Sequence, residues 1–279
     1  GRSPYSVWRS VRHSVEVTQD MIWRAVIGLV LSACLAWADE KSDSLTRAGI
    51  KEFGAAYDKW DAAGFAAAAD LFQQACASGS ASVTNYYWLG VAQFHRLLQL
   101  RSLPPSPTNA VMADAAMDAA LRALEVAADL DPRHAETHAL LGTLYGMKID
   151  GNLLRAARFG PRVQRHRNRA LALGAENPRV RYLLGTCQFH TAKKAAARRE
   201  ALASFLAAEK LFAAEARRPA GPLEPRWGRS SCLTFIGRTY ELLGQRAEAA
   251  DYFRKALTEH PADFVAKEGL ARVTATDNP

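Results

Sequence analysis

Ser230–Asp263 reads SSCLTFIGRTYELLGQRAEAADYFRKALTEHPAD, and this stretch decides the fold. Small residues recur in it at helical spacing, with aromatic residues between them and a proline near the end. These positions are Gly237, Tyr240, Ala249, Phe253, Ala256 and Pro261. The small residues let two antiparallel helices approach closely, and the aromatic rings fill the space between the helices. Pro261 ends the second helix because it has no backbone N–H to donate. The stretch therefore predicts a helix–turn–helix unit.

The order and spacing of these residues resemble the tetratricopeptide repeat (TPR), a helix–turn–helix unit of about 34 residues. One such unit cannot bury its own apolar face, so the resemblance implies that further units stack on it. The chain is also rich in alanine and leucine, with little clustering of β-branched residues. We therefore expect an all-α, TPR-like α-solenoid.

Four earlier segments repeat the pattern less regularly, which makes about five helix–turn–helix units with insertions over residues 39–273. The four segments are Lys41–Ser78, Asn85–Arg133, His134–Pro178 and Arg179–Arg218. Leu103–Asn109 contains three prolines and is expected to be a loop, and Pro219–Gly228 is expected to be a linker. We expect Lys267–Val273 to cap the stack and residues 274–279 to form a disordered tail.

The N-terminal region carries an export pattern. Residues 1–20 contain no methionine and are interpreted as upstream, non-native sequence. Residues 21–38 resemble a secretory signal peptide, with a basic start, a short apolar run and an Ala-x-Ala ending at Ala38. The apolar run is shorter than the about 20 residues of a membrane helix. Leu31–Cys34 also resembles a bacterial lipobox, in which Cys34 would carry a lipid. Cleavage after Ala38 predicts a periplasmic protein, lipidation of Cys34 predicts an outer- or inner-membrane lipoprotein, and the third interpretation is a retained anchor or an artefact.

The formal net charge of +8 over 279 residues is moderately basic. Such a charge is compatible with acidic partners but falls short of a nucleic-acid-binding tail, so no nucleic-acid partner is expected. The four cysteines are far apart and show no zinc-site spacing. Cys187 and Cys232 fall in first helices of repeats, where a small buried thiol is the ordinary interpretation. In an exported protein, two of the cysteines could also form a disulfide.

The first helices of three units supply candidate binding residues. Tyr87–His95 in the second unit aligns with Tyr182–His190 in the fourth, and both end in Gln-Phe-His. The TPR resemblance implies that particular first-helix positions line the concave surface, and aromatic residues beside arginine suit a groove that holds a peptide. The candidates are Tyr87, Phe94, His95, Arg179, Tyr182, Phe189, His190, Arg238 and Glu241. The alternative is that the aromatic residues only pad contacts between neighbouring units.

A second candidate site is a basic cluster in the third unit. It consists of Arg155, Arg158, Arg162, Arg165, Arg167 and Arg169. Such a cluster suits phosphate, an anionic lipid surface or an acidic peptide. The alternative is a solvated helix face and loop. Phe159 is nearly alone as an interleaved aromatic residue, so base stacking with nucleic acid is not supported.

The chain shows no pattern that points to catalysis. It contains no phosphate-binding loop, no Gly-x-Ser-x-Gly and no Gly-x-Gly-x-x-Gly. His134 and His138 have the spacing of a metal pair, but the glutamate that a zinc protease carries next to the first histidine is absent. We therefore expect no enzyme activity, no cofactor and no metal.

Several stretches extend the resemblance beyond the repeat itself. They are Tyr145–Lys148, Phe159–Pro161, Asn177–Val180, Leu183–Gly185 and Pro222–Gly228. In this order they resemble a group of exported TPR proteins of Gram-negative bacteria whose function is uncharacterised, and the resemblance covers roughly residues 135–245. That group often has a glycine-rich segment where this chain has Thr191–Arg198 without glycine, so the role of that loop is in doubt. The resemblance implies a fold and a cellular address but no substrate.

Together these features favour a non-catalytic, exported TPR protein that binds a protein or peptide partner through its concave surface. The alternative is a structural or assembly component of the cell envelope, whose arginine cluster contacts lipid or an anionic polymer. Lipidation of Cys34 would add a membrane tether.

Overall fold

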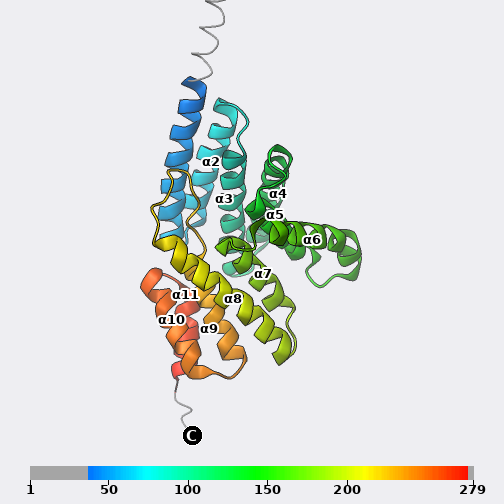
Figure 1. The fold of residues 1–279 in the computed structure, drawn as a ribbon, viewed down its shortest axis with the longest axis vertical. Helices are drawn as coiled ribbons and strands as arrows, with labels where there is room; N and C mark the ends of the chain where they lie inside the picture. The colour runs from blue at the N-terminus through cyan, green and yellow to red at the C-terminus, as the bar shows by residue number, and fades with distance from the viewer. Residues whose placement is uncertain (1–36, 276–279) are drawn as a thin grey trace, which may run out of the picture.

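The computed structural model describes residues 37–275 (Figure 1). Cys34 and most of the expected signal peptide lie outside the described residues. Helix α1 covers residues 37–59, and the described part of the chain contains no strand. The other helices are α2 (Ala62–Ser78), α3 (Val83–Ser102), α4 (Pro107–Leu130), α5 (Ala135–Ile149), α6 (Leu153–Gly174), α7 (Pro178–Thr191), α8 (Ala195–Ala216), α9 (Arg229–Leu242), α10 (Arg246–Glu259) and α11 (Phe264–Thr274).

Consecutive helices pack in pairs, and the pairs stack side by side (Figure 1). In every pair except α5 and α6, a glycine of the first helix faces a large side chain of the second. A Cβ atom at Gly237 would lie 2.8 Å from the Phe253 ring, and one at Gly185 would lie 2.6 Å from Phe205. The spacing of small and aromatic residues in the sequence predicts this close contact between the two helices of a pair. The prediction of an all-α solenoid of paired helices, with α11 packed against the last pair, is confirmed.

The third pair consists of α5 and α6. Its second half is one continuous helix, α6, which passes through Pro161. Asn152 caps the helix by accepting a hydrogen bond from the N–H of Arg155 at 3.0 Å. Helix α6 packs mainly against α5, buries only Ala170, and extends sideways from the stack (Figure 1). One whole face of α6 therefore meets solvent.

The loop predicted for Leu103–Asn109 ends earlier in the structure than the sequence suggests. Pro107 begins α4, and Ser106 caps that helix by accepting from the N–H of Asn109 at 3.1 Å. A proline is tolerated in the first turn of a helix because the N–H that it lacks has no partner there. Proline is excluded from the interior of a helix, but Pro107 lies in the first turn, so the prediction of a loop was wrong at this residue.

The two ends of the stack touch each other. The Tyr57 hydroxyl of α1 lies 2.7 Å from the Ser231 hydroxyl of α9. Nε2 of His260, after α10, lies 3.0 Å from the carbonyl oxygen of Asp58. The stack is therefore tightly wound, and its inner face is narrow. Among the described helices, none combines the length and the hydrophobicity that a membrane crossing requires.

Candidate functional site

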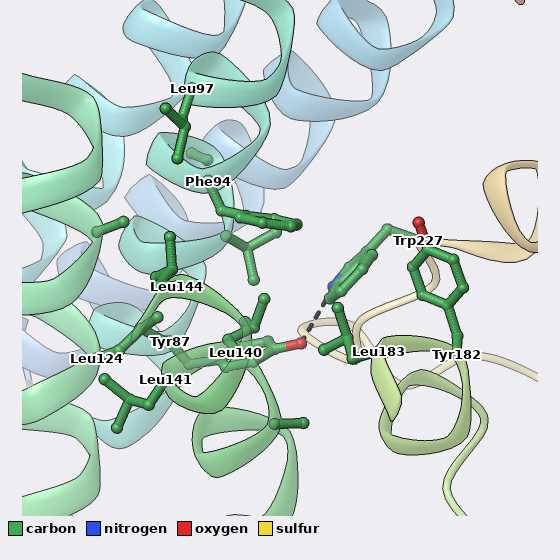
Figure 2. Packing of buried hydrophobic residues seen from close by; sticks show 14 of the residues in the cluster. Tyr87, Phe94, Leu97, Leu124, Leu140, Leu141, Leu144, Tyr182, Leu183 and Trp227 are labelled. Atoms are coloured by element: carbon green, nitrogen blue, oxygen red, sulfur yellow. Dashed lines mark hydrogen bonds between the residues drawn. The ribbon is translucent and has the colours of Figure 1, made fainter. Parts of the chain in front are cut away.

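The inner face of the stack is occupied by the chain's own linker, residues 217–228, between α8 and α9. The indole N–H of Trp88 on α3 donates to the carbonyl oxygen of Leu223 at 2.9 Å. Trp227 is 4% exposed, and its indole N–H donates to the Tyr87 hydroxyl at 3.0 Å. Figure 2 shows Trp227 close to Tyr87 on one side and Tyr182 on the other. The linker thus crosses from the second unit to the fourth and fills the space between them.

Six of the nine residues expected to line a groove are buried. They are Tyr87, Phe94, His95, Arg179, Tyr182 and Phe189, with exposed fractions between 1% and 9%. The rings of His95 and Tyr182 lie 5.1 and 6.4 Å from the Trp227 ring. Tyr87, His95 and Tyr182 thus lie against Trp227 of the linker. Phe189 packs instead against the rings of Phe205 and Phe235. Contact of the groove candidates with a partner stays a prediction.

Arg179 is part of a buried ionic network under the linker. Its Nε atom donates to Glu136 at 2.8 Å, and its two terminal nitrogens donate to Glu215 at 3.0 and 2.6 Å. Glu136 also accepts from Asn177 at 2.7 Å and from the Tyr87 hydroxyl. Burial alone lowers the pKa of Arg179, but the two carboxylates outweigh it and raise that pKa overall. Arg179 therefore stays charged and joins α5, α7 and α8.

The other three groove candidates lie further along the stack. Arg238 lies over the Phe189 and Phe235 rings, at 4.9 and 5.1 Å from their centroids. His190 is exposed, and its ring lies 5.9 Å from Phe235. Glu241 forms an ion pair of 2.8 Å with Arg272 on α11. These contacts tie the fourth unit, the fifth unit and the capping helix together.

The arginine cluster, in contrast, is largely at the surface. Its members follow one another three and four positions apart on α6, except for Arg167, so they share one side of the helix. We call this surface the arginine face; it consists of Arg155, Arg158, Arg162, Arg165 and Arg169, all exposed. Arg167 is half-buried on another side of α6 and donates to Gln164 at 2.9 Å. None of the ion pairs found within residues 37–275 includes any of these arginines.

Two arginines of the face are held in place by neutral groups. The side chain of Arg169 donates to the carbonyl oxygen of Pro132 at 2.8 Å. Arg162 donates to the Tyr145 hydroxyl at 3.3 Å and lies 5.3 Å from the centre of that ring. The hydroxyl of Tyr145 in turn donates to Glu125. These contacts orient the guanidinium groups without neutralising them.

An open cleft of about 610 Å³ adjoins the N-terminal end of the arginine face. Its walls come from α3, α4, α5 and α6, and it is lined by Arg101, Asp114, Met117, Asp118, Met147, Lys148, Asp150, Leu154, Arg155, Arg158 and Phe159. Lys148 and Asp118 form an ion pair of 2.8 Å across it. Arg155 and Arg158 belong to both surfaces, so the cleft and the arginine face are continuous.

The two histidines with metal-pair spacing point to different partners. Nδ1 of His134 lies 2.7 Å from the Thr137 hydroxyl, whereas Nδ1 of His138 lies 3.0 Å from Nδ1 of His166 on α6. In the part of the chain that the structure describes, no three or more metal-ligating side chains gather. The contact of His134 lies within the first turn of α5, and the contact of His138 connects α5 to α6.

The side chains of this chain that contact the inner-face residues were not predicted from the sequence. Glu136 and Glu215 lie in helices whose patterns give no sign that either is buried. Trp227 offered a weak signal, because a tryptophan in a linker rich in proline and glycine needs an apolar surface to cover it.

Comparisons with known proteins bear on the fold. No family model and no curated protein matches the chain. Its structure is similar to that of a thermophilic TPR protein of Thermus thermophilus, with a TM-score of 0.59 and 16% identity, covering 83% of this chain and 98% of that one. Yeast Tom70 is more distant, with a TM-score of 0.41 and 15% identity, covering 76% of this chain and 51% of Tom70. The similarity to the Thermus protein supports the all-α, TPR-like solenoid fold of this chain.

Proposed function

We propose that this chain is a non-catalytic binding protein that holds an anionic partner against the arginine face of α6. One observation carries the proposal. Five exposed arginines share one side of a helix, and within the described residues no carboxylate lies within ion-pair distance of any of them.

Such a face is unfavourable for the isolated protein. Like charges three or four residues apart destabilise a helix by about 0.2–0.5 kcal/mol per pair. The face contains four such neighbours in succession, from Arg155 to Arg169. An anionic partner would remove this repulsion, and a guanidinium group can bind a carboxylate or a phosphate through two parallel hydrogen bonds. The face spans about 21 Å at 1.5 Å per residue, enough for several contacts on one linear partner.

The concave surface is the second candidate, and the linker is the observation that favours it. An extended segment already binds there through a carbonyl oxygen and a tryptophan, as a peptide partner would. A partner at this place has to displace Trp227, which is buried. We rank this candidate second because the arginine face is open and the concave surface is filled.

We also propose that the protein is exported. The supporting observation is the resemblance of residues 21–38 to a signal peptide. Cleavage after Ala38 would preserve the contact in which Asp39 accepts from the N–H of Ser80 at 3.0 Å. The intact mass of the protein from the membrane and soluble fractions of its native host tests the proposal. A chain that starts at Asp39 or at a lipidated Cys34 supports export, and a chain that retains residues 21–38 in the soluble fraction contradicts it.

The binding proposal is tested with immobilised poly-L-glutamate, a probe that presents only carboxylates. One variant changes the five residues of the arginine face to glutamine. The control variant changes five exposed cations elsewhere to glutamine and so alters the net charge equally; these are Arg47, Lys51, Lys59, Lys193 and Lys194. We expect the face variant to elute at much lower salt than the wild type and the control to elute with the wild type, because only the clustered charges act together. Equal shifts of both variants would show that net charge, and not the face, governs binding.

A further inference from the structure

We infer that the partner of this surface is an acidic polypeptide segment with a large apolar side chain at one end. The acidic part binds the arginine face, and the apolar side chain enters the adjoining cleft. This inference rests on the proposed function and specifies the partner of the same site.

The apolar part of the cleft lining suits an apolar side chain. Met117, Met147, Leu154 and Phe159 contribute to its lining, from three different helices. Methionine side chains are flexible and adapt to different shapes, so they are common at surfaces that accept a partner's side chain. A volume of about 610 Å³ exceeds the space that one large side chain needs. The cleft can therefore take an apolar anchor together with the backbone that carries it.

Exposed apolar surface lies at the same end of α6. Leu153 and Leu154 are 86% and 83% exposed, the highest fractions among the large hydrophobic residues of the described chain. Single exposed leucines are ordinary on protein surfaces. Leu154 lines the cleft, and Leu153 precedes it on α6, so the two form a larger apolar patch, which a partner would cover.

The cleft lining carries both signs of charge: Asp114, Asp118 and Asp150 are acidic, and the part next to the arginine face is basic. Arg155 and Arg158 lie in the lining and in the face at once. Lys148 and Arg158 also flank the Phe159 ring, at 5.9 and 5.3 Å from its centre. A segment anchored in the cleft would therefore place its next residues along a row of cations. The carboxylates should follow the anchor at spacings of three and four, which is the spacing of the arginines.

The shape of the site favours a polypeptide over a lipid bilayer. The apolar side of α6 packs against α5 and cannot enter a membrane. The arginines form a row along one helix, which matches a linear partner. A cleft also matches a protruding side chain, whereas a flat bilayer surface cannot fill it.

Part of the site is already ordered before a partner binds. The contacts of Arg162 with Tyr145 and of Arg169 with Pro132 hold two guanidinium groups in place. Groups that are already oriented lose less conformational freedom on binding. We therefore expect these two arginines to contribute more to affinity than Arg165, for which the structure gives no such contact.

The inference is tested by fluorescence anisotropy with labelled peptides of about 15 residues, long enough to cover the face. One peptide is rich in glutamate and ends in leucine, the second has alanine in place of the leucine, and the third has glutamine in place of the glutamates. We expect the full-length protein to bind the leucine peptide about tenfold more tightly than the alanine peptide, a difference ordinary for one buried apolar side chain, and not to bind the glutamine peptide. Leu154→Ser should reduce that ratio towards one without changing affinity for the alanine peptide; Leu154 is exposed, so the fold should tolerate the change.

The outcomes separate the two proposals. Equal affinity of the wild type for the leucine and alanine peptides would overturn the anchor site and leave the proposed function standing. Equal affinity of the wild type and the five-glutamine variant for both acidic peptides would overturn the proposed function itself. Vesicles containing phosphatidylglycerol form the lipid arm of the experiment. Binding to vesicles that survives saturation with the leucine peptide would overturn the choice of a polypeptide partner.

Discussion

Arg179 and the arginine face of α6 lie in neighbouring elements and have opposite surroundings. Arg179 is 2% exposed and donates to two buried carboxylates, Glu136 and Glu215. The five arginines of the face are exposed and contact only neutral groups or solvent in the described structure. Both are candidates for partner binding on the basis of sequence. Their surroundings indicate that the inner arginine holds the stack together and that the outer ones are available to a partner.

The difference follows from what a buried charge requires. An arginine out of water must be paired and hydrogen-bonded, so its partners belong to the same fold. An exposed arginine is solvated and needs no partner, so a row of them reflects a different requirement. The inner face of this protein is therefore a core in which polar groups are satisfied, although the repeat pattern alone suggests a groove.

Arg179→Met should have the largest effect in the molecule. It removes the cation and leaves two carboxylates buried and close together, which we expect to destabilise the protein by about 3–5 kcal/mol. Unfolding by urea, followed by circular dichroism, measures the effect. Adding Glu136→Gln and Glu215→Gln to this variant should restore part of the stability, because no buried charge is then left. A loss below about 1 kcal/mol for Arg179→Met would contradict the structural role.

The two Gln-Phe-His sequences allow the same comparison of a buried and an exposed side chain, here between two histidines, His95 and His190. His95 is 3% exposed beside Trp227, and burial lowers its pKa to about 4, whereas His190 is exposed. A buried histidine with a lowered pKa stabilises the fold above its unfolded pKa of about 6.5, and that contribution is lost as the pH falls towards 4. The full contribution is about 3 kcal/mol for the shift of His95.

His95→Phe should therefore flatten the dependence of stability on pH between about 6.5 and 4. His190→Phe should flatten it less, because His190 is exposed, although partial burial and Arg238 lower its pKa as well. Urea unfolding of the three proteins across this range measures the difference. Parallel curves for all three would show that burial by the linker does not control the titration of His95.

The fold follows from local features of the sequence, and the site does not. The close approach of Gly237 and Phe253 depends on residues within one unit, so their spacing is sufficient to predict it. The burial of His95 depends on rings from other elements, namely Phe53 of α1, Phe65 of α2 and Trp227 of the linker. Within the same three residues Gln-Phe-His, the histidine is buried in one unit and exposed in the other, and no local pattern distinguishes them.

The arginine face is accessible to sequence reasoning in part. The sequence identifies the set of arginines, but two features suggest an irregular segment instead of a single helix: Asp150-Gly151-Asn152, just before α6, and Pro161 inside it. Only a continuous helix makes the spacing of three and four meaningful, because it brings the side chains to one side. The cleft depends on four helices from two units and could not be predicted from any one of them.

The smallest effect on stability is expected at the arginine face. Changing its five arginines to glutamine removes four repulsive pairs of neighbouring arginines. It leaves every ion pair of the described residues intact. The free energy of unfolding should therefore rise by about 1 kcal/mol at low salt. The gain should fall as salt is added, because exposed charges are screened over about 10 Å at 0.1 M. Urea unfolding at low and high salt tests this. A destabilisation that persists at high salt would mean that these side chains support the packing of α6 on α5, and the face would then share the structural role of Arg179.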